Sequence, residues 1–145
     1  MLLANMWSLL NFEAHDIFAQ CAANDIKVIV GGPFSSGILA TGADPADGSC
    51  PFYNYTPADS DTRARCREIE AACTKHGIPL IAAALQFPLL HPVVSCVIPG
   101  GKNPREIESN IEMMNVNIPV QFWYELQQGG LLPLDCPLPE LDSGL

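Results

Sequence analysis

Three short runs of apolar residues along the chain have the length and composition of buried β-strands. They lie within Met1–Leu10, Ile26–Val30 and Val93–Ile98, and the last two are rich in β-branched residues. The first run is interrupted by polar residues and is interpreted as a strand with its exit loop. The second and third runs end in clusters of glycine and proline, which predict tight turns.

Elsewhere apolar residues recur at the three- and four-residue spacing of amphipathic helices. The predicted helices are Glu13–Asn24, Asp59–His76, Pro79–Leu90, Pro104–Met114 and Pro119–Gln128. Asp59 or Ser60 is a suitable N-cap for the second helix, and Gly77 is typical of a helix end. Helices therefore follow each of the three predicted strands.

Three segments fall outside this pattern. Residues 35–40 predict a short turn or the start of a helix, residues 41–58 a long loop, and residues 131–145 an extended tail. A loop as long as 41–58 inside a compact domain is often functional, for example as a lid. The alternation of strands and helices, with crossovers long enough for parallel strands, predicts an α/β fold. Three strands are few for a closed sheet.

The turn after the third strand leads directly into a capped helix. Asn103 is the predicted N-cap, Pro104 occupies the first helical position, and Glu106 lies three residues after the cap. A strand, a glycine turn and a helix N-terminus present free backbone N–H groups and the positive end of the helix dipole. This arrangement predicts a phosphate-binding site.

Composition narrows the classes of partner. The chain has 145 residues, is 48% hydrophobic and is only 16% charged, whereas an average soluble domain has about 25% charged residues. So little charge indicates faces that contact a partner or further sequence. The net charge is −9 with only seven scattered Lys and Arg residues, which argues against a nucleic-acid partner.

The six cysteines form no Cys-x-x-Cys pair, and no histidine lies at zinc-ligand spacing, so we expect no metal. Free thiols are typical of the reducing cytosol, which predicts a cytoplasmic protein. No apolar run approaches the roughly 18 residues of a membrane span. The residues after Met1 lack a basic segment, so we expect no signal peptide and no membrane partner.

Four sequence blocks, in this order, resemble the aldo-keto reductase superfamily: Val30–Leu39, Ile81–Pro88, Val97–Gly100 and Asn110. Within the superfamily, the chain is most similar to sugar dehydrogenases that act at C1, the D-threo-aldose 1-dehydrogenase and L-fucose dehydrogenase type. The resemblance extends from Leu2 to about Pro139, and the order and spacing of the blocks are more specific than any one of them.

The resemblance implies a partial TIM (β/α)8 barrel. The family fold is a barrel of about 300 residues, and this chain resembles a C-terminal fragment: strands six to eight with their helices and the C-terminal extension. The family's catalytic Asp, Tyr, Lys and His belong to the first part of the barrel and have no counterpart here. We therefore expect no catalytic residue in this chain.

The resemblance also implies a site for the pyrophosphate of a nicotinamide dinucleotide. Gly32, Pro33, Phe34, Ser35 and Ser36 match the family's loop after strand seven, which wraps this group. Glycine allows the backbone to approach a phosphate, and serine hydroxyls donate hydrogen bonds. From the residues alone, the same segment is equally an ordinary turn from a strand to a helix.

After strand eight, the family contacts the adenosine half of the cofactor. Gly100, Gly101 and Lys102 match the segment that meets the ribose phosphate, and Asn110 matches an asparagine that faces the adenine. Glu106 falls where NADP-preferring members carry an arginine.

A carboxylate at this position repels a 2′-phosphate and accepts a hydrogen bond from a 2′-hydroxyl, which favours NAD over NADP. Lys102 or Arg105 offers a compensating positive charge for a phosphate.

The chain departs from the family pattern near the nicotinamide. Ala4 takes the place of a glutamine that contacts the ring, and Gly31 that of an aromatic residue that stacks on it. Trp7 is either a replacement aromatic surface or part of the core. Tyr53 and Tyr55 are aromatic residues of the long loop that are suited to a sugar site or to a solvated loop.

Three interpretations follow from the sequence. In the first, the chain is the nucleotide-binding half of an NAD(P)-dependent oxidoreductase that oxidises an aldose at C1 to a lactone. In the second, it is a non-catalytic nucleotide-binding module, or a half barrel that self-associates through exposed strand edges. In the third, it is an unstable remnant of a decayed gene, insoluble when expressed alone.

Overall fold

A three-stranded parallel sheet is the framework of the molecule, and the computed structural model describes residues 1–140. Strands β1 (Leu2–Ala4), β2 (Val28–Gly31) and β5 (Val94–Ile98) lie in the order β1-β2-β5. Both neighbouring pairs are parallel, so the predicted α/β fold with parallel strands is confirmed. β1 and β5 are the two edges of the sheet.

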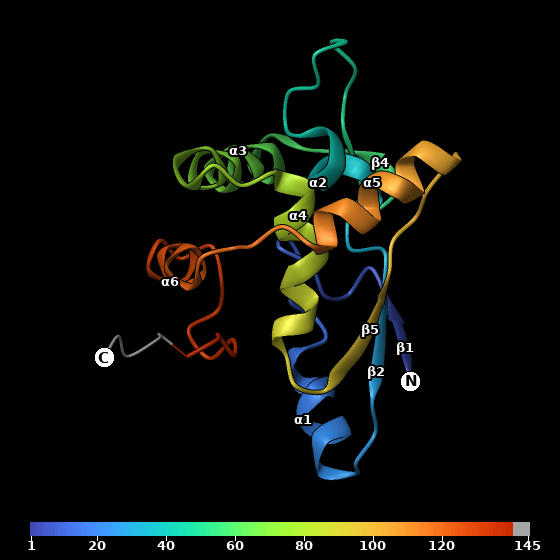
Figure 1. Ribbon diagram of the computed structural model, residues 1–145, viewed down its shortest axis with the longest axis vertical. Coiled ribbons are helices and arrows are strands. Elements are labelled where there is room, and N and C mark those ends of the chain that lie inside the picture. The colour runs from blue at the N-terminus through green and yellow to red at the C-terminus, as the bar shows by residue number, and fades with distance from the viewer. Residues whose placement is uncertain (141–145) are drawn as a thin grey trace.

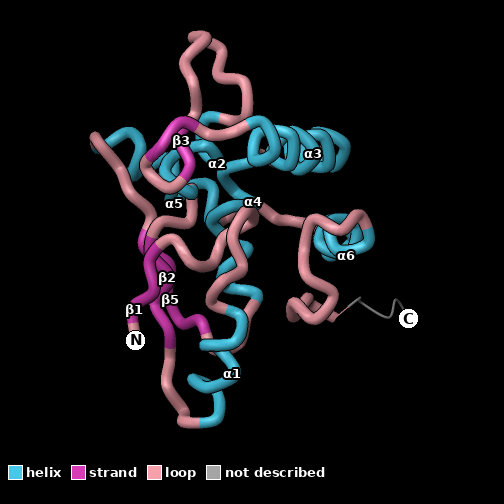
Figure 2. The backbone as a smooth tube through the Cα atoms, turned by 180° about the vertical axis from the view of Figure 1, so that it is seen from behind, coloured by secondary structure: helices cyan, strands magenta, loops and turns pink. Residues whose placement is uncertain are grey.

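The helices cover one face of this sheet and leave the other open (Figures 1 and 2). Val28 and Val30 point to the covered face and are fully buried. On the opposite face, Leu2 pairs with Ile29, and Ile29 pairs with Cys96. Leu2 is 58% exposed, so within residues 1–140 no element shields this row of side chains.

All five predicted helices are present. They are α1 (His15–Ala23), α3 (Ser60–His76), α4 (Leu80–Gln86), α5 (Pro104–Met114) and α6 (Val120–Gln128). The predicted helix Pro79–Leu90 continues beyond α4 as the 3-10 helix η2 (Phe87–Leu90). Pro88 causes this change because it has no amide N–H with which to continue the α-helical ladder. The turn predicted at 35–40 is the 3-10 helix η1 (Ser35–Gly37) followed by the short helix α2 (Ile38–Thr41).

Capping residues set the ends of α3. Asp59 is its N-cap, and its Oδ1 accepts a hydrogen bond from the Thr62 N–H at 2.7 Å. This bond holds the pKa of Asp59 below its ordinary value. Gly77 ends the helix in the left-handed conformation, with φ of 66°. The sequence signals for both ends are thus confirmed.

The core between the sheet and the helices is aromatic. Trp7 is 1% exposed and packs against Phe18 and Phe87, with ring centroids 4.8 and 5.4 Å away. Phe87 in turn contacts Trp123 of α6. Trp7 is therefore a core residue, and it supplies no aromatic surface to a ligand.

Two segments predicted to be irregular have local structure. Within 41–58, the strands β3 (Phe52–Tyr53) and β4 (Thr56–Pro57) form a small antiparallel hairpin, and the residues before it project beyond the rest of the molecule (Figure 1). The predicted tail, 131–145, is described only as far as Glu140, and 141–145 lie outside the described residues. Up to that point it turns once and buries Leu131, Leu132 and Cys136.

Candidate functional site

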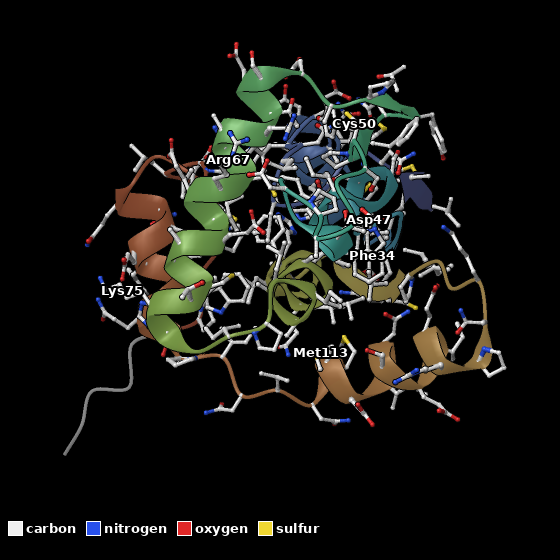
Figure 3. The ribbon with its side chains drawn as sticks, turned by 90° about the horizontal axis from the view of Figure 1, so that it is seen from above. Phe34, Asp47, Cys50, Arg67, Lys75 and Met113 are labelled. Atoms are coloured by element: carbon white, nitrogen blue, oxygen red, sulfur yellow. The ribbon has the colours of Figure 1, made fainter. Side chains whose placement is uncertain are left out.

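A cavity of about 430 Å³ opens at the carboxyl ends of the three parallel strands. The loops that follow β1, β2 and β5 contribute to its walls, together with the N-terminal turn of α5 and the tip of the β3–β4 hairpin. Figure 3 looks down on this end of the molecule, with Phe34 near the centre of the view. The carboxyl edge of a parallel sheet is where α/β proteins place their ligands, and the cavity has the size of a small-molecule site.

Eight of the ten residues predicted to bind a cofactor line this cavity: Gly32, Phe34, Ser36, Gly100, Gly101, Lys102, Glu106 and Asn110. They come from two segments more than sixty residues apart, the β2–η1 loop and the β5–α5 turn. The backbone joins the two segments where the Gly32 N–H donates to the Ile98 carbonyl at 3.3 Å.

Pro33 and Ser35 do not line the cavity, because both side chains turn inward and are buried. Ser35 Oγ lies 2.7 Å from Ser8 Oγ, and this buried hydroxyl pair ties the loop after β2 to the loop after β1. The hydroxyl of Ser35 is thus used inside the protein. These two residues support the loop and do not present groups to a ligand.

Seven further residues complete the lining: Asn5, Gly37, Ala40, Thr41, Tyr55, Ile81 and Ser109. Ser109 and Tyr55 carried sequence signals, the first as a departure from the family pattern and the second as an exposed loop aromatic. Asn5 directly follows β1, at the carboxyl edge of the sheet where α/β proteins bind ligands. The apolar run around it does not show where the strand ends, so the sequence did not predict its place in the cavity. Of the other four, Gly37 and Ile81 lie in the sequence blocks that carry the family resemblance, and Ala40 and Thr41 carry no sequence signal.

The loop after β2 has the shape of a cradle. A Cβ atom at Gly32 would collide with Asn5 Oδ1, and the φ of +71° strains any other residue, so the position favours glycine. Ser36 also has a left-handed backbone, with φ of 63°, and its Oγ accepts a hydrogen bond from the Tyr55 N–H at 3.0 Å. Since the oxygen is the acceptor in this bond, the Ser36 hydroxyl proton remains available to a ligand.

The N-terminus of α5 is capped as the sequence predicted, but its anion-binding groups are partly occupied. Asn103 Oδ1 accepts from the Glu106 N–H at 3.0 Å, which confirms the N-cap. Glu106 Oε2 accepts from the Lys102 N–H at 2.8 Å, and its Oε1 accepts from Asn103 Nδ2 at 3.2 Å. The protein's own carboxylate therefore lies where an external anion would bind.

The wall opposite the β2–η1 loop retains open space. The space around Gly100 is empty, since a Cβ atom built there would meet no atom within 4 Å. Asn110 is 9% exposed, and its Nδ2 donates to the Gly100 carbonyl at 3.3 Å, which leaves its Oδ1 as an acceptor. The glycine turn thus leaves space beside a buried amide whose acceptor oxygen has no partner among the described residues.

The β3–β4 hairpin forms the outer rim of the cavity. Tyr55 belongs to the lining, whereas Tyr53 points away from it and its hydroxyl donates to the Leu10 carbonyl at 3.4 Å. Burial, together with the negative charges of Glu13 and Asp59, raises the pKa of Tyr53. Of the two tyrosines considered for a ligand site, the structure brings only Tyr55 to the cavity.

Comparison with known proteins decides the family. The sequence profile of the Aldo/keto reductase family matches residues 1–129. This chain is an aldo/keto reductase family member. The prediction made from the four sequence blocks is thus confirmed.

Two characterised relatives resemble this aldo/keto reductase chain over most of its length. Pyridoxal 4-dehydrogenase from Microbacterium luteolum is 35% identical over 132 residues, covering 90% of the chain. D-threo-aldose 1-dehydrogenase from a Pseudomonas species is 33% identical over 134 residues, covering 92% of the chain. The chain spans 37% and 40% of the length of these two relatives.

A solved aldo-keto reductase, AKR11C1 from Bacillus halodurans, has the same fold. Its holo form matches with a TM-score of 0.62 at 18% identity, and its apo form with a TM-score of 0.64 at 19% identity. Both matches cover 88% of the chain and 42% of the solved structure. The chain therefore has the fold of part of an aldo-keto reductase, a family that uses nicotinamide cofactors.

None of the helices within residues 1–140 has the length and apolar character needed to cross a membrane. Over the same residues, no three His, Cys, Asp or Glu side chains come together in a way that would hold a metal ion.

Proposed function

We propose that the cavity binds a nicotinamide dinucleotide, and that the chain is the nucleotide-binding part of an oxidoreductase that converts an aldose to a lactone at C1. In this proposal β1, β2 and β5 are strands six, seven and eight of the family barrel. The observation that carries it is the meeting of Gly32, Ser36, Gly100 and Asn110 from two distant segments around one cavity. The resemblance to D-threo-aldose 1-dehydrogenase supports the sugar substrate.

Each group in the cavity has a role that follows from its chemistry. Gly32 and Ser36 approach the pyrophosphate, the first through its backbone and the second through its free hydroxyl proton. Gly100 and Gly101 leave room for the adenosine ribose, and Lys102 supplies positive charge beside it. Asn110 offers its Oδ1 to the adenine. Phe34 contributes apolar surface, and Pro33 and Ser35 hold the loop in place.

The chemistry would belong to the bound nicotinamide, which accepts a hydride from the anomeric carbon of the sugar. No residue of this chain is proposed to act as the acid or base. We therefore expect the isolated chain to bind the dinucleotide and to show no turnover with NAD and aldoses, measured by the absorbance of reduced nicotinamide.

Glu106 favours NAD over NADP. Its carboxylate is anchored on the Lys102 N–H and on Asn103, so it lies at the helix N-terminus as a fixed negative charge. A 2′-phosphate at the same helix end would have to displace it or lie beside it, and like charges at contact repel. Lys102 is the counter-charge nearest in sequence.

Calorimetric titration of the 145-residue chain with NAD tests the proposal, with Gly100 as the probe. Gly100→Leu projects a side chain into the cavity, and we expect it to weaken NAD binding at least about tenfold through steric exclusion. Gly100→Ala is the matched control, because a single Cβ meets only open space; we expect it to bind NAD within about twofold of the unaltered chain. Circular dichroism would establish that both variants are folded.

The proposal fails if the unaltered chain does not bind NAD, or if Gly100→Leu binds it as well as Gly100→Ala does. Turnover by the isolated chain would refute the expectation that this chain has no catalytic residue. It would leave the proposed nucleotide binding intact.

A second candidate function, a self-associating half barrel, is favoured by the uncovered side of the sheet. Leu2 and Ile98, on the two edge strands, are 58% and 48% exposed, and open strand edges pair readily with other chains. Sedimentation at increasing protein concentration tests this candidate. A monomer at every concentration would exclude it. A cytoplasmic location, inferred from the free thiols, stays a prediction.

A further inference from the structure

The uncovered face of the sheet is apolar across all three strands, which lie at the margin of the molecule (Figure 2). Its side chains form two rows, Leu2, Ile29 and Cys96 in one and Ala4, Gly31 and Ile98 in the other. None of the six is charged, and the four on the edge strands are exposed. Parallel sheets occur almost only where both faces are covered, so we expect a second layer of protein on this face.

Both edges of the sheet also lack the usual protection. β1 and β5 are the edge strands, and neither Leu2–Ala4 nor Val94–Ile98 contains a charged residue or a proline. Proteins that keep an edge strand free commonly place lysine, another charge or proline on it. The unpaired backbone groups of these two edges are therefore open to a further strand.

An apolar groove of about 340 Å³ lies between β5, α4 and α5. α5 contributes Ile107, Ile111 and Met114 to it, which are 44%, 61% and 37% exposed. Apolar side chains at this spacing form one face of a helix. A strand added at the β5 edge would lie beside this stripe and bury it.

A second copy of this chain fits both edges at once. All three strands are parallel, so a two-fold rotation about an axis along the strands brings β1 of each copy beside β5 of the other. Both new strand pairs are then parallel, like the pairs within one copy. The two sheets close into a six-stranded barrel that has no edge, and the apolar rows face its interior.

The size of the side chains in the rows fits such a narrow barrel. The diameter of a barrel grows with the number of strands, and eight strands already enclose only enough space for side chains. Six strands enclose less, and the row of Ala4, Gly31 and Ile98 contains two residues with little or no side chain. Three copies would form a wider barrel of nine strands and leave this row unfilled. Antiparallel pairing of two β5 edges would leave both rows exposed.

We infer that two copies of this chain associate by parallel pairing of β1 with the partner copy's β5, so that the uncovered face becomes the interior of a shared barrel. The inference rests on the second candidate function, self-association, and names its interface. It is independent of nucleotide binding, because none of the six residues in the two rows lines the cavity.

Sedimentation equilibrium of the 145-residue chain gives the first readout, and we expect the mass of two chains. Leu2→Asp places a carboxylate in the barrel interior, and we expect it to weaken dimerisation at least about a hundredfold, because an unpaired charge is costly to bury. Leu134→Asp is the matched control, since Leu134 is 86% exposed outside the sheet. We expect it to leave dimerisation unchanged. Circular dichroism would establish that both variants are folded.

Cysteine cross-linking then identifies which strands meet. In a Cys50→Ser background, Leu2→Cys places a thiol in the same row as the native Cys96. Within one copy β2 separates these two positions by roughly 10 Å, twice the spacing of neighbouring strands, whereas across the shared edge they lie on neighbouring strands. A short bis-alkylating reagent should therefore join Cys96 of one chain to position 2 of the other, giving a band of two chains on a denaturing gel. Cys50→Ser alone should give no such band.

Other outcomes would overturn the inference. A link between two Cys96 thiols in the Cys50→Ser chain would do so, because it requires the two β5 edges to meet. A mass of three or more chains would do so as well, and so would equally stable dimers of Leu2→Asp and Leu134→Asp. In these cases self-association would stand, through a different interface.

A monomer at every concentration would remove both the inference and the second candidate function, and would leave the open edges to an unlike chain. Titration of the same samples with NAD tests the proposed nucleotide binding separately, whatever the oligomeric state.

Discussion

At the scale of single residues, the proposed preference for NAD over NADP rests on Glu106. Replacing it by glutamine removes the negative charge and keeps an acceptor for the Lys102 N–H. We expect Glu106→Gln to raise the affinity for NADP roughly threefold to tenfold, since one like-charge interaction at the site disappears. Binding of NAD should change by less than about twofold. Titration of the chain with each dinucleotide measures both effects.

Glu108→Gln is the matched control, because it makes the same change of charge on the same helix outside the cavity lining. An equal gain in NADP affinity in both variants would assign the effect to overall charge and not to Glu106.

The sequence predicted Glu106 as the third residue after an N-cap, and this follows from local spacing alone. It did not predict that the carboxylate would accept from Lys102. That contact depends on how Gly100 and Gly101 turn the chain back over the helix. The inward direction of Ser35 was missed for a similar reason, since its partner Ser8 belongs to another loop.

At the scale of elements, a charged cluster joins the C-terminal turn of α3 to α6. Glu125 accepts from Lys75 Nζ at 2.8 Å and lies 2.8 Å from His76 Nε2. The hydrogen bonds to Lys75 and then His76 hold the pKa of Glu125 below its ordinary value of 4.5. Because the folded pKa is the lower one, the carboxylate stabilises the fold above the unfolded pKa, and this stabilisation is lost as the pH falls through the folded pKa.

We therefore expect Glu125→Gln to unfold at a lower urea concentration than the unaltered chain at neutral pH, and at the same concentration once the pH lies below the folded pKa of Glu125. Glu112→Gln serves as the control, since no ion pair of Glu112 occurs among the described residues. A difference between Glu125→Gln and the unaltered chain that persisted at low pH would contradict the electrostatic origin.

Helices were the most predictable elements, because capping residues next to them in the sequence determine where they begin and end. Asp59 and Gly77 fix α3, and Asn103 fixes the start of α5. The β3–β4 hairpin was not predicted. Its strands are two residues long, and its turn places Asn54 and Tyr55 in left-handed conformations without the glycine that usually signals such a turn.

At the scale of the whole molecule, the six free cysteines report on which surfaces are open. Cys50 in the projecting loop and Cys96 on the uncovered sheet face are exposed, and the other four are buried (Figure 3 labels Cys50). Burial raises the pKa of Cys66, Cys73 and Cys136 to about 12. Since the thiolate is the reactive form, we expect two thiols to react rapidly with an aromatic disulfide reagent in native buffer and four only after unfolding.

In the Cys50→Ser variant, Cys96 is the one exposed cysteine among the described residues, so its reaction with the reagent can be followed separately. Protection of Cys96 at high protein concentration would support association through the sheet face, and rapid reaction of more than two thiols would contradict the burial described here.

The parallel direction of the strands followed from crossover lengths, and the family from motif order, but the residues that share the cavity could be identified only in the folded structure. Residues 32–36 and 100–110 were assigned to one ligand only through the resemblance. Nothing in their spacing indicates that the Gly32 N–H meets Ile98. The hydrogen bond between Asn5 and Tyr55 could not be predicted either. The two residues are fifty positions apart, and the turn of the hairpin that carries Tyr55 lacks the glycine that usually signals such a turn.

The walls of the cavity come from two distant parts of the chain, so binding of a ligand between them would affect how long the protein stays folded. One wall belongs to residues before position 56 and the other to residues after position 80, so a bound dinucleotide would span both and bind only when both are in place. A ligand that binds only the folded state stabilises it by about 2.7 kcal/mol at a concentration one hundred times its dissociation constant. The supply of cofactor would then set how often this small, open sheet unfolds, and how much of it a protease removes.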